Sequence, residues 1–359
     1  MTARRKIRVL VVDDSAVVRE TLSNLINRHP DLEVMAVAKD PYDAAAEIRK
    51  EVPDVVTLDV EMPRMDGITF LRKLMSQRPI PVVICSSLVG EGTNTLLAAM
   101  EAGAVDLVQK PAVGTRKFLE ESAIQIQDKI LAAAAARLAK RSTSPISPLA
   151  GRTDKAASSG SMAMYKTTQT IVALGASTGG TEALRQVLGP LPPFAPPIVV
   201  VQHMPEHFTA AFAGRLDSEC QISVREARDG DRVIRGQALI APGNRHLTLT
   251  RSGAEYRVNV ADGPLVSRHR PSVDVLFRSV ARYAGSNAIG VIMTGMGNDG
   301  AEGLKAMREA GAHTIGQNER SCVVYGMSRV AQRIGSVVEE LDLSEIPGAL
   351  VKLGREKAA

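Results

Sequence analysis

The chain has no tryptophan, few other aromatic residues and no long apolar run. Aromatic residues make up 3% of its 359 positions, which argues against a surface on which nucleic-acid bases would stack. No apolar stretch approaches the roughly 18 residues that a membrane-spanning helix needs. The apolar run at residues 7–12 contains Arg8 and ends in Asp13-Asp14, and no signal-peptidase site follows it. We therefore expect neither a nucleic-acid partner nor direct insertion into a membrane.

Cysteine is also scarce. Cys85, Cys220 and Cys322 are odd in number and far apart, which argues against a disulfide framework and against a zinc knuckle. This usage is typical of a reducing compartment, so we expect the protein to be cytoplasmic. The net charge of +5 gives a mild preference for anionic partners. The lysines and arginines are interpreted as a scattered, solvated surface.

The length predicts two to three domains, and the first half of the chain alternates strand-like and helix-like segments. The predicted strands are Ile7–Val12, Glu33–Val37, Asp54–Leu58, Pro81–Ser86 and Val105–Gln109. The predicted helices are Ala16–Arg28, Tyr42–Lys50, Ile68–Gln77, Asn94–Ala102 and Lys117–Ala139. Five βα units of this length predict one parallel sheet with helices on both faces, which is a doubly wound (βα)5 domain.

A change of composition separates the two halves. Residues 141–164 are rich in Ser, Ala, Pro and Gly and lack a sustained apolar period, which is typical of a flexible linker. Strands are then predicted at Thr170–Leu174, Ile198–Gln202, Ile222–Glu226, Ala238–Ala241, Ala288–Thr294 and Thr314–Gln317. Residues 247–260 alternate in the manner of an antiparallel hairpin. We predict an α/β protein with a (βα)5 domain at 1–125, a helix tail and flexible linker at 126–168, and an α/β domain with a mostly parallel sheet at 169–355.

Three carboxylates follow predicted strands of the first domain. Asp13 and Asp14 come after the first strand, and Asp59 comes after the third. Because ligands bind outside the carboxyl ends of strands in doubly wound sheets, we expect these carboxylates to converge. A divalent cation would relieve their repulsion, and Mg²⁺ suits oxygen ligands while leaving waters for a phosphoryl group to replace. Asp59 is then a candidate phosphoryl acceptor. For Asp14, the alternative is that it caps the following helix.

Ser86 and Lys110 end the fourth and fifth predicted strands, where a hydroxyl and an ammonium can hold phosphoryl oxygens. The segments VVDDS, LDVEMPRMDG, VVICSS and VQKPA resemble the response-regulator receiver domain over about residues 5–125. The resemblance implies phosphorylation of Asp59 and a Mg²⁺ ion held by Asp13, Asp14 and Asp59. It also implies that Ser86 and Lys110 are switch residues and that a histidine kinase is the phosphodonor.

The second half begins with a predicted strand that runs into GASTGG. The spacing fits G-x-S-x-G, a turn that projects the hydroxyl of Ser177 at the sheet edge beside backbone N–H groups. A phosphate-binding loop or a structural turn would show the same pattern. A dinucleotide-binding loop is disfavoured, because the glycine spacing differs and the next strand ends in Gln202-His203 rather than in an acidic residue.

A nucleophilic serine needs a base, and the base needs a carboxylate that orients it. His203 directly follows the strand predicted after that of Ser177. A metal pair of His203 with His207 is disfavoured, because Pro205 interrupts the helix face between them. Asp299 follows a later strand and alone would be interpreted as a helix cap. Together the three residues predict a Ser-His-Asp triad in a chain order unlike that of α/β-hydrolases. The remaining histidines of this half are interpreted as ordinary loop or strand residues: His246, His269 and His313.

Residues 170–335 resemble the catalytic domain of the chemotaxis protein-glutamate methylesterase family, CheB. The segments that carry the resemblance are GASTGG, VVQHMPEHFTAAFAGRLD, VREARDGD, APGNRHLTL, HRPSVDVLFRSVA, GVIMTGMGNDGAEGL and SCVVYGMSRVA. The resemblance implies Ser177 as the nucleophile, His203 as the general base and Asp299 as its orienting acid. It further implies that Thr178 and Met296 line the active site and help to build the oxyanion hole.

The activity implied by the resemblance is hydrolysis of glutamyl methyl esters on methylated chemoreceptors, together with deamidation of receptor glutamines. The esterase chemistry would need no cofactor, and a CheA-type histidine kinase would supply the phosphoryl group. The resemblance implies that the resting receiver covers the active site and that phosphorylation of Asp59 exposes Ser177. Two features depart from the family pattern, namely Ser328, where proline is expected, and the long linker of low complexity.

Two alternatives belong to other classes of protein. One is a non-enzymatic response regulator whose second half binds DNA or a protein. A DNA-binding output predicts a helix-turn-helix with a basic recognition helix, whereas Ser177 and Asp299 lie in glycine-rich strand-to-helix turns. The other alternative is a small-molecule esterase, which would need no receiver and usually has an apolar acyl pocket that the sequence alone does not reveal.

Overall fold

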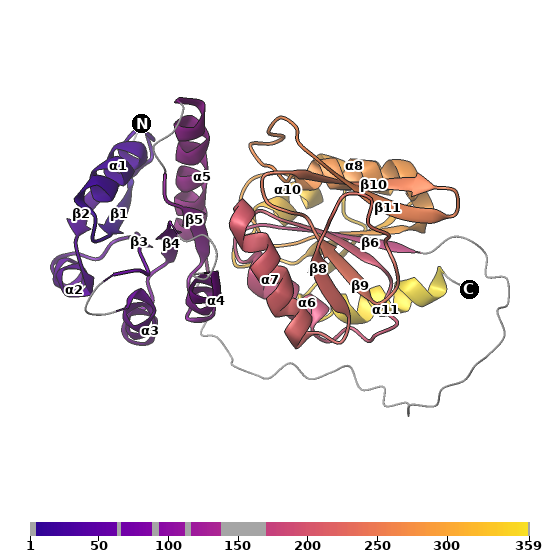
Figure 1. Cartoon of the computed structure of the whole chain (residues 1–359), viewed down its shortest axis with the longest axis horizontal. Coiled ribbons are helices and arrows are strands. Elements are labelled where there is room, and N and C mark those ends of the chain that lie inside the picture. The colour runs from indigo at the N-terminus through magenta and orange to yellow at the C-terminus, as the bar shows by residue number, and fades with distance from the viewer. Residues whose placement is uncertain (1–4, 63–65, 88–92, 112–115, 138–169, 358–359) are drawn as a thin grey trace. The chain divides into compact units, whose positions relative to one another are not determined.

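The computed structural model describes residues 5–62, 66–87, 93–111, 116–137 and 170–357. These residues form two compact units, each built mainly from one half of the chain (Figure 1). Each unit is built on an open parallel sheet. None of the described helices is both long and apolar enough to span a membrane.

The N-terminal unit has a five-stranded sheet in the order β2-β1-β3-β4-β5. Its strands are β1 (Ile7–Val12), β2 (Leu32–Ala38), β3 (Val55–Leu58), β4 (Val82–Ser86) and β5 (Asp106–Gln109). Its helices are α1 (Ala16–Asn27), α2 (Pro41–Lys50), α3 (Gly67–Gln77), α4 (Thr93–Glu101) and α5 (Arg116–Ala134). The strand order reverses between β1 and β3, so the carboxyl ends of these two strands flank the point where such sheets bind ligands.

The three central strands of this sheet are apolar on both faces. Strands β3 and β4 are buried throughout, and β1 is buried from Val9 onward. Helices cover both faces of a parallel sheet, which is why these strands show no polar alternation. The first three helices begin at side-chain caps, which are Ser15, Asp40 and Asp66. The residue that caps α1 is thus Ser15, and the alternative that Asp14 caps this helix is wrong.

The C-terminal unit has a seven-stranded, wholly parallel sheet in the order β14-β13-β12-β6-β7-β9-β8, and β10 pairs with β11 in a separate antiparallel sheet. The strands are β6 (Ile171–Ala176), β7 (Ile198–Gln202), β8 (Ser223–Glu226), β9 (Gln237–Ile240), β10 (His246–Ser252), β11 (Glu255–Ala261), β12 (Ala288–Ile292), β13 (His313–Gln317) and β14 (Glu339–Leu341). The helices are α6 (Gly180–Leu188), α7 (Glu206–Glu219), α8 (Val273–Tyr283), η1 (Gly285–Asn287), α9 (Ala301–Glu309), α10 (Met327–Arg333) and α11 (Ile346–Glu356).

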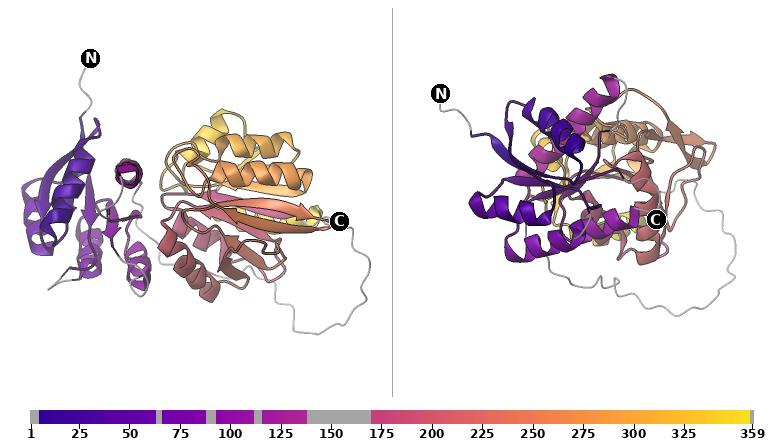
Figure 2. Two further views of the ribbon diagram at one scale, coloured as in Figure 1. Left: turned by 45° about the horizontal axis from the view of Figure 1, so that its top comes forward. Right: turned by 60° about the vertical axis from the view of Figure 1, so that its left-hand side comes forward.

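Strand β6 lies in the middle of the seven-stranded sheet, with β12 on one side and β7 on the other. Helices α8 and α9, in orange, and α10, in yellow, cover one face, and the rose-coloured α6 and α7 cover the other (Figure 2). The chain first extends the sheet from β6 through β7 and then returns to β12. The carboxyl ends of β6, β7 and β12 therefore meet at a reversal of strand order.

The predicted α/β class is confirmed, with a parallel sheet in each half and an antiparallel hairpin in the second. One strand was not predicted: β14 is three residues long, charged and partly exposed, so it lacks the apolar pattern of an internal strand. Helix α5 ends at Ala134, and hydrogen bonds between residues three apart follow at Ala135 and Ala136. The predicted end at Ala139 lies outside the described residues. The predicted domain boundaries at residues 125 and 169 stay predictions.

A glycine at the end of β6 allows α8 to pack directly on the central strand. A methyl group added at Gly175 would overlap Cγ1 of Val273 and would approach the ring of Phe277 to 3.1 Å. Val273 is the first residue of α8 and both side chains are fully buried. The absence of a side chain at Gly175 thus sets how closely the first turn of α8 approaches the strand that precedes Ser177.

We predict that Gly175→Ala destabilises the C-terminal unit by about 1–3 kcal/mol, because the core around it has no room for an extra methyl group. Scanning calorimetry of the full chain measures this as a lower unfolding temperature. The matched control is Gly348→Ala in α11, where an added methyl group meets no described atom within 4 Å. An unchanged unfolding temperature in Gly175→Ala would show that α8 moves away at little cost.

Candidate active site

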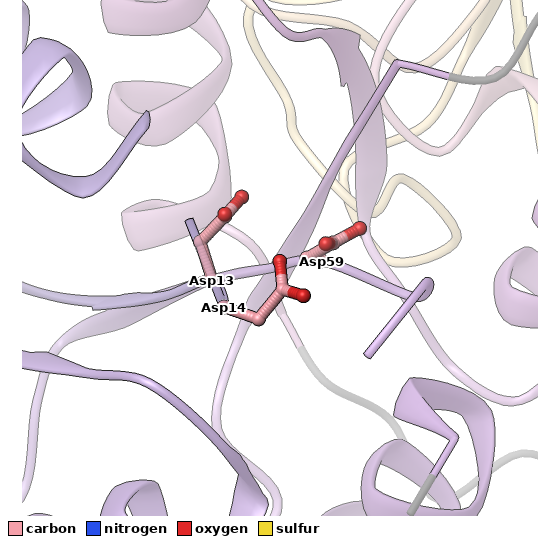
Figure 3. Close-up of side chains that lie close together, drawn as sticks. All are labelled: Asp13, Asp14 and Asp59. Atoms are coloured by element: carbon pink, nitrogen blue, oxygen red, sulfur yellow. The ribbon is translucent and has the colours of Figure 1, made fainter. Parts of the chain in front are cut away.

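The predicted carboxylates of the N-terminal unit do converge. Asp13 and Asp59 follow the neighbouring strands β1 and β3, and Asp14 lies beside them (Figure 3). One oxygen atom from each of the three lies within 4.8 Å of the others. Asp13 and Asp59 are buried, whereas Asp14 is exposed. This set of oxygen donors fits the preference of Mg²⁺, with an open side toward solvent.

Lys110 joins the two buried carboxylates. Its Nζ lies 2.7 Å from Oδ2 of Asp13 and 2.9 Å from Oδ2 of Asp59. Burial by itself would lower the pKa of Lys110, but the hydrogen bonds to these carboxylates raise it above its ordinary value. Burial raises the pKa of Asp13 despite the opposing effect of Lys110. Ser86 lies next to Lys110, whose backbone N–H donates to the carbonyl of Ser86 over 2.9 Å. All five predicted residues thus gather at one edge of the sheet.

In the C-terminal unit, Ser177 and His203 leave the sheet side by side. The register of β6 and β7 pairs Ala176 with Gln202, and the N–H of His203 donates to the carbonyl of Ala176 over 3.1 Å. Ser177 and His203 are the next residues of the two strands. Both are buried, at 4% and 5% exposure. Adjacent parallel strands therefore carry the predicted nucleophile and base out of the sheet at the same level.

Gln202 ties the backbones of these two residues together. Its side-chain Nε2 donates to the carbonyl of Ser177 over 2.9 Å and to that of His203 over 3.3 Å. The side chain is 2% exposed. Sequence reasoning missed this role, because a glutamine at the end of a strand carries no signal of the two carbonyls that it bridges.

Asp299 accepts hydrogen bonds on both carboxylate oxygens. Its Oδ2 lies 2.8 Å from Nε2 of His203 and 2.7 Å from the N–H of Val273. Its Oδ1 accepts from the hydroxyl of Ser272 at 2.7 Å and from the N–H of Asp274 at 3.1 Å. Burial by itself would raise the pKa of Asp299, but the hydrogen bonds from His203, Ser272 and Val273 lower it. The carboxylate stays charged at the N-terminus of α8, which favours a negative group.

The structure also answers which residue caps the helix after Asp299. The residue before the first turn of α9 is Gly300, and Asp299 instead points its carboxylate to His203 and the start of α8. Ser272, which caps α8 through the N–H of Val275, was not among the predicted residues. Its only sequence signal is a Ser at the start of a helical pattern, which does not indicate a partner on another segment.

The other histidines differ in surroundings. The ring of His269 stacks on that of His203 with 3.7 Å between centroids and 15° between planes, so its interpretation as an ordinary loop residue was incomplete. His246 accepts from the N–H of Ser272 and contacts the carbonyl of Pro264, which is a structural role. His313, the first residue of β13, pairs with Glu339 of β14. His207 lies in the first turn of α7.

Thr178 and Met296 lie on the two loops that flank Ser177. The carbonyl of Thr178 accepts from the hydroxyl of Thr294, which follows β12, over 2.9 Å. The N–H of Ser177 donates to the carbonyl of Thr294 over 2.9 Å. Met296 follows on that loop and is 37% exposed. These bonds hold the loop after β6 and the loop after β12 against each other.

Ser328, the departure from the family pattern, is buried in the first turn of α10. Its hydroxyl donates to the carbonyl of Ile292 over 3.3 Å. The first turn of a helix accepts proline because its N–H groups have no partner within the helix. Serine meets the same backbone requirement and adds a bond to the end of β12.

Comparison with known proteins agrees with the division of the chain into an N-terminal and a C-terminal unit. Residues 9–121 match the family model described as response regulator receiver domain, and residues 172–350 match the one described as CheB methylesterase. A receiver therefore precedes a domain of the methylesterase class.

Similarity to individual proteins extends over the full chain. The chain is 58% identical to protein-glutamate methylesterase/protein-glutamine glutaminase 3 of Geobacter metallireducens, over 97% of this chain and 99% of that protein. It is 57% identical to protein-glutamate methylesterase/protein-glutamine glutaminase 5 of Anaeromyxobacter dehalogenans, over 99% of this chain and 98% of that protein. The crystal structure of the Thermotoga maritima CheB methylesterase catalytic domain matches 52% of this chain and 99% of its own, with a TM-score of 0.51 and 37% identity. The chain belongs to the CheB methylesterase family, in the form that carries an N-terminal receiver.

We predict that Asp299→Asn destabilises the C-terminal unit by about 1.5–3 kcal/mol at pH 7, since either orientation of the amide places an NH₂ group against donors. The folded-state pKa of Asp299 lies below the unfolded value of about 3.9, so its contribution is present above that pH. The difference in the free energy of unfolding between Asp299→Asn and the wild type should stay constant between pH 5 and 7. It should become smaller as the pH falls below about 4, because the wild-type carboxylate then becomes protonated.

Urea unfolding followed by circular dichroism at pH 7.0, 5.0 and 3.5 measures this difference. The matched control is Asp262→Asn, which alters an exposed ion pair with Arg245 and should change the stability by less than about 1 kcal/mol. A difference for Asp299→Asn that widens toward pH 3.5 would contradict the hydrogen-bonded, charged carboxylate.

Proposed function

We propose that the chain is a phosphorylation-activated hydrolase that demethylates glutamate methyl esters on chemoreceptors, using Ser177, His203 and Asp299. One observation carries the proposal above the others. Ser177 and His203 leave adjacent strands in register, and His203 is hydrogen bonded to a buried carboxylate that stays charged. A general base that an acid orients beside a serine is the arrangement that acyl transfer needs. The full-length similarity to protein-glutamate methylesterases supplies the substrate class.

In the proposed reaction, the hydroxyl of Ser177 attacks the ester carbonyl while His203 removes its proton. Because Asp299 engages Nε2, the proton passes to Nδ1, and the charge that forms on the ring is stabilised by Asp299. This assignment of the two ring nitrogens is the reverse of that in the chymotrypsin-type triad. Methanol leaves with the proton that His203 held, and water then hydrolyses the acyl-serine through the same base.

The oxyanion that develops in this reaction needs donors near Ser177. We assign this role to backbone N–H groups of Thr178 and Met296, on the two loops that Thr294 holds together. Preorganised backbone donors need no rearrangement when the charge develops, and losing one typically costs ~10²–10³ in turnover. The chemistry requires no metal or organic cofactor.

A second activity is proposed for the same residues. An amide carbonyl is attacked in the same way as an ester, and ammonia leaves in place of methanol, so a receptor glutamine becomes glutamate. The relatives at 58% and 57% identity carry the name protein-glutamine glutaminase as well as protein-glutamate methylesterase. The pairing of names supports deamidation as a property of this site.

Control by phosphorylation is proposed for the N-terminal unit. Asp59 would accept a phosphoryl group from a CheA-type histidine kinase, with Mg²⁺ held by Asp13, Asp14 and Asp59. The ion would offset the charge of the carboxylates and of the incoming phosphoryl oxygens. Lys110 already bridges Asp13 and Asp59, and Ser86 lies next to it, so both are placed to contact those oxygens. To change the ratio of active to inactive conformation from 1:99 to 99:1, the phosphoryl group would have to favour the active conformation ~10⁴-fold.

The compartment is proposed to be the cytoplasm. The three cysteines all lie in the described part of the chain and form no disulfide there, which suits a reducing environment. Burial raises the pKa of the Cys85 thiol and of the Cys220 thiol to about 12, so both stay protonated and unreactive.

We predict that Ser177→Ala abolishes methanol release from methylated receptor membranes, with a loss of at least about 10³-fold. The alanine variant removes only the attacking oxygen, so the unfolding temperature should stay close to that of the wild type. Activity near the wild-type rate in this variant would eliminate Ser177 as the nucleophile. If folded wild-type protein released no methanol with or without acetyl phosphate, the receptor would be the wrong substrate or the output domain would be a binding module.

We predict that Asp59→Asn keeps the basal rate of methanol release within about twofold but removes its stimulation by acetyl phosphate and Mg²⁺, because the amide cannot form an acyl phosphate. Chelation of Mg²⁺ should remove the stimulation of the wild type in the same way. The matched control is Asp31→Asn, an exposed carboxylate of the same unit, which should respond normally. Full stimulation of Asp59→Asn would place the switch elsewhere.

A further inference from the structure

The imidazole of His203 is held by two side chains from different segments. Asp299 contacts its edge through Nε2 at 2.8 Å, and the ring of His269 stacks on its face, with 3.7 Å between the ring centroids and 15° between the ring planes. The hydrogen bond to Asp299 restrains where the edge of the ring points but does not by itself stop the ring from rotating about the axis of that bond. A stacked neighbour removes the tilt, because rotation would bring the edge of one ring into the face of the other.

His269 itself is positioned by a tight turn between β11 and α8. The N–H of His269 donates to the carbonyl of Val266 over 2.9 Å, and the reverse bond measures 3.1 Å. The two residues between them, Ser267 and Arg268, both have positive φ angles, of 50° and 69°. Residues other than glycine seldom adopt this conformation, and it persists only where the surroundings impose it.

Further contacts hold both ends of this turn. The hydroxyl of Ser267 donates to Oδ2 of Asp274 over 3.4 Å, in the first turn of α8. The guanidinium of Arg270 donates to Oδ1 of Asn244 at 2.6 and 2.9 Å and to the carbonyl of Gly263 at 2.6 Å. The stack on His203 thus rests on a loop that is anchored on both sides, rather than on a side chain that happens to lie nearby.

We infer that His269 is a positioning residue of the hydrolase: its ring sets the plane in which His203 presents Nδ1 to Ser177. The inference rests on the proposed function of Ser177, His203 and Asp299. His269 would make no bond to the substrate, so its loss should lower kcat rather than raise KM. A flat aromatic ring should replace it, whereas a branched aliphatic side chain of similar size should not.

The test compares His269→Leu with His269→Phe in the full-length protein, measuring methanol release from methylated receptor membranes. Because a small misplacement of a catalytic group costs up to about 100-fold, His269→Leu should lower kcat by about 10–100-fold and leave KM within about twofold. His269→Phe should retain most of the wild-type kcat. A second readout is the rate at which a fluorophosphonate labels Ser177, which needs the activated serine but no receptor. It should fall in His269→Leu and recover in His269→Phe.

The matched control is His313→Leu. This histidine is the first residue of β13 and pairs with Glu339, the first residue of β14, so it lies at the amino ends of these strands, whereas Ser177 follows the carboxyl end of β6. Its loss should leave kcat unchanged. Wild-type kcat in His269→Leu overturns the inference. So does an equal loss in the Leu and Phe variants, which indicates a packing role, or a change confined to KM with unchanged labelling, which indicates contact with the receptor.

Ser177→Ala, measured in parallel, separates the inference from the proposed function. Wild-type activity in Ser177→Ala overturns both. Loss of activity in Ser177→Ala together with wild-type kcat in His269→Leu overturns the inference alone. Circular dichroism and the unfolding temperature of each variant show that the compared proteins are folded.

Discussion

The arrangement of the C-terminal unit depends on the buried carboxylate of Asp299. It joins the loop after β12, the first turn of α8 and the histidine that follows β7, which are far apart in the chain. Each oxygen of the carboxylate accepts two hydrogen bonds, so neither is left unsatisfied when the charge is buried. Helix α8 can supply these donors only because Gly175 allows its first turn to approach β6. The glycine at the end of β6 thereby allows the charge of Asp299 to be buried on the loop after β12.

The two sheets show how one class of fold serves different chemistry. Both place polar residues beyond the carboxyl ends of strands that flank a reversal of strand order. In the N-terminal unit three carboxylates meet one ammonium, which leaves negative charge that suits a divalent cation. In the C-terminal unit the carboxylate of Asp299 accepts hydrogen bonds from four donors of the protein itself. The number of carboxylates at the edge, rather than the fold, decides between the two kinds of site.

The parts that the sequence predicts are those encoded by local patterns. Apolar runs predicted nearly every strand, and Ser177, His203 and Asp299 were selected as candidates because each follows such a run. The order of the strands was not predictable, because it depends on pairing between segments far apart in the chain. Gln202, Ser272 and His269 were missed for the same reason: each acts on a partner that only folding brings near. Strand β14 was not predicted, because its short, charged sequence pairs with β13 at the edge of the sheet and has no buried face.

The three restraints on His203 differ in physical origin. The register of β6 and β7 sets the position of its backbone through hydrogen bonds of the sheet, which tolerate little variation. Asp299 sets the direction of the ring by a charge-assisted bond, which is strong and directional. In the inference drawn above, His269 sets the plane of the ring by stacking, from a turn with two residues in the left-handed region. The stack is the restraint that rests on the identity of one side chain rather than on the backbone of the sheet or on a charge, so a substitution at His269 should change the plane of the ring without changing its position.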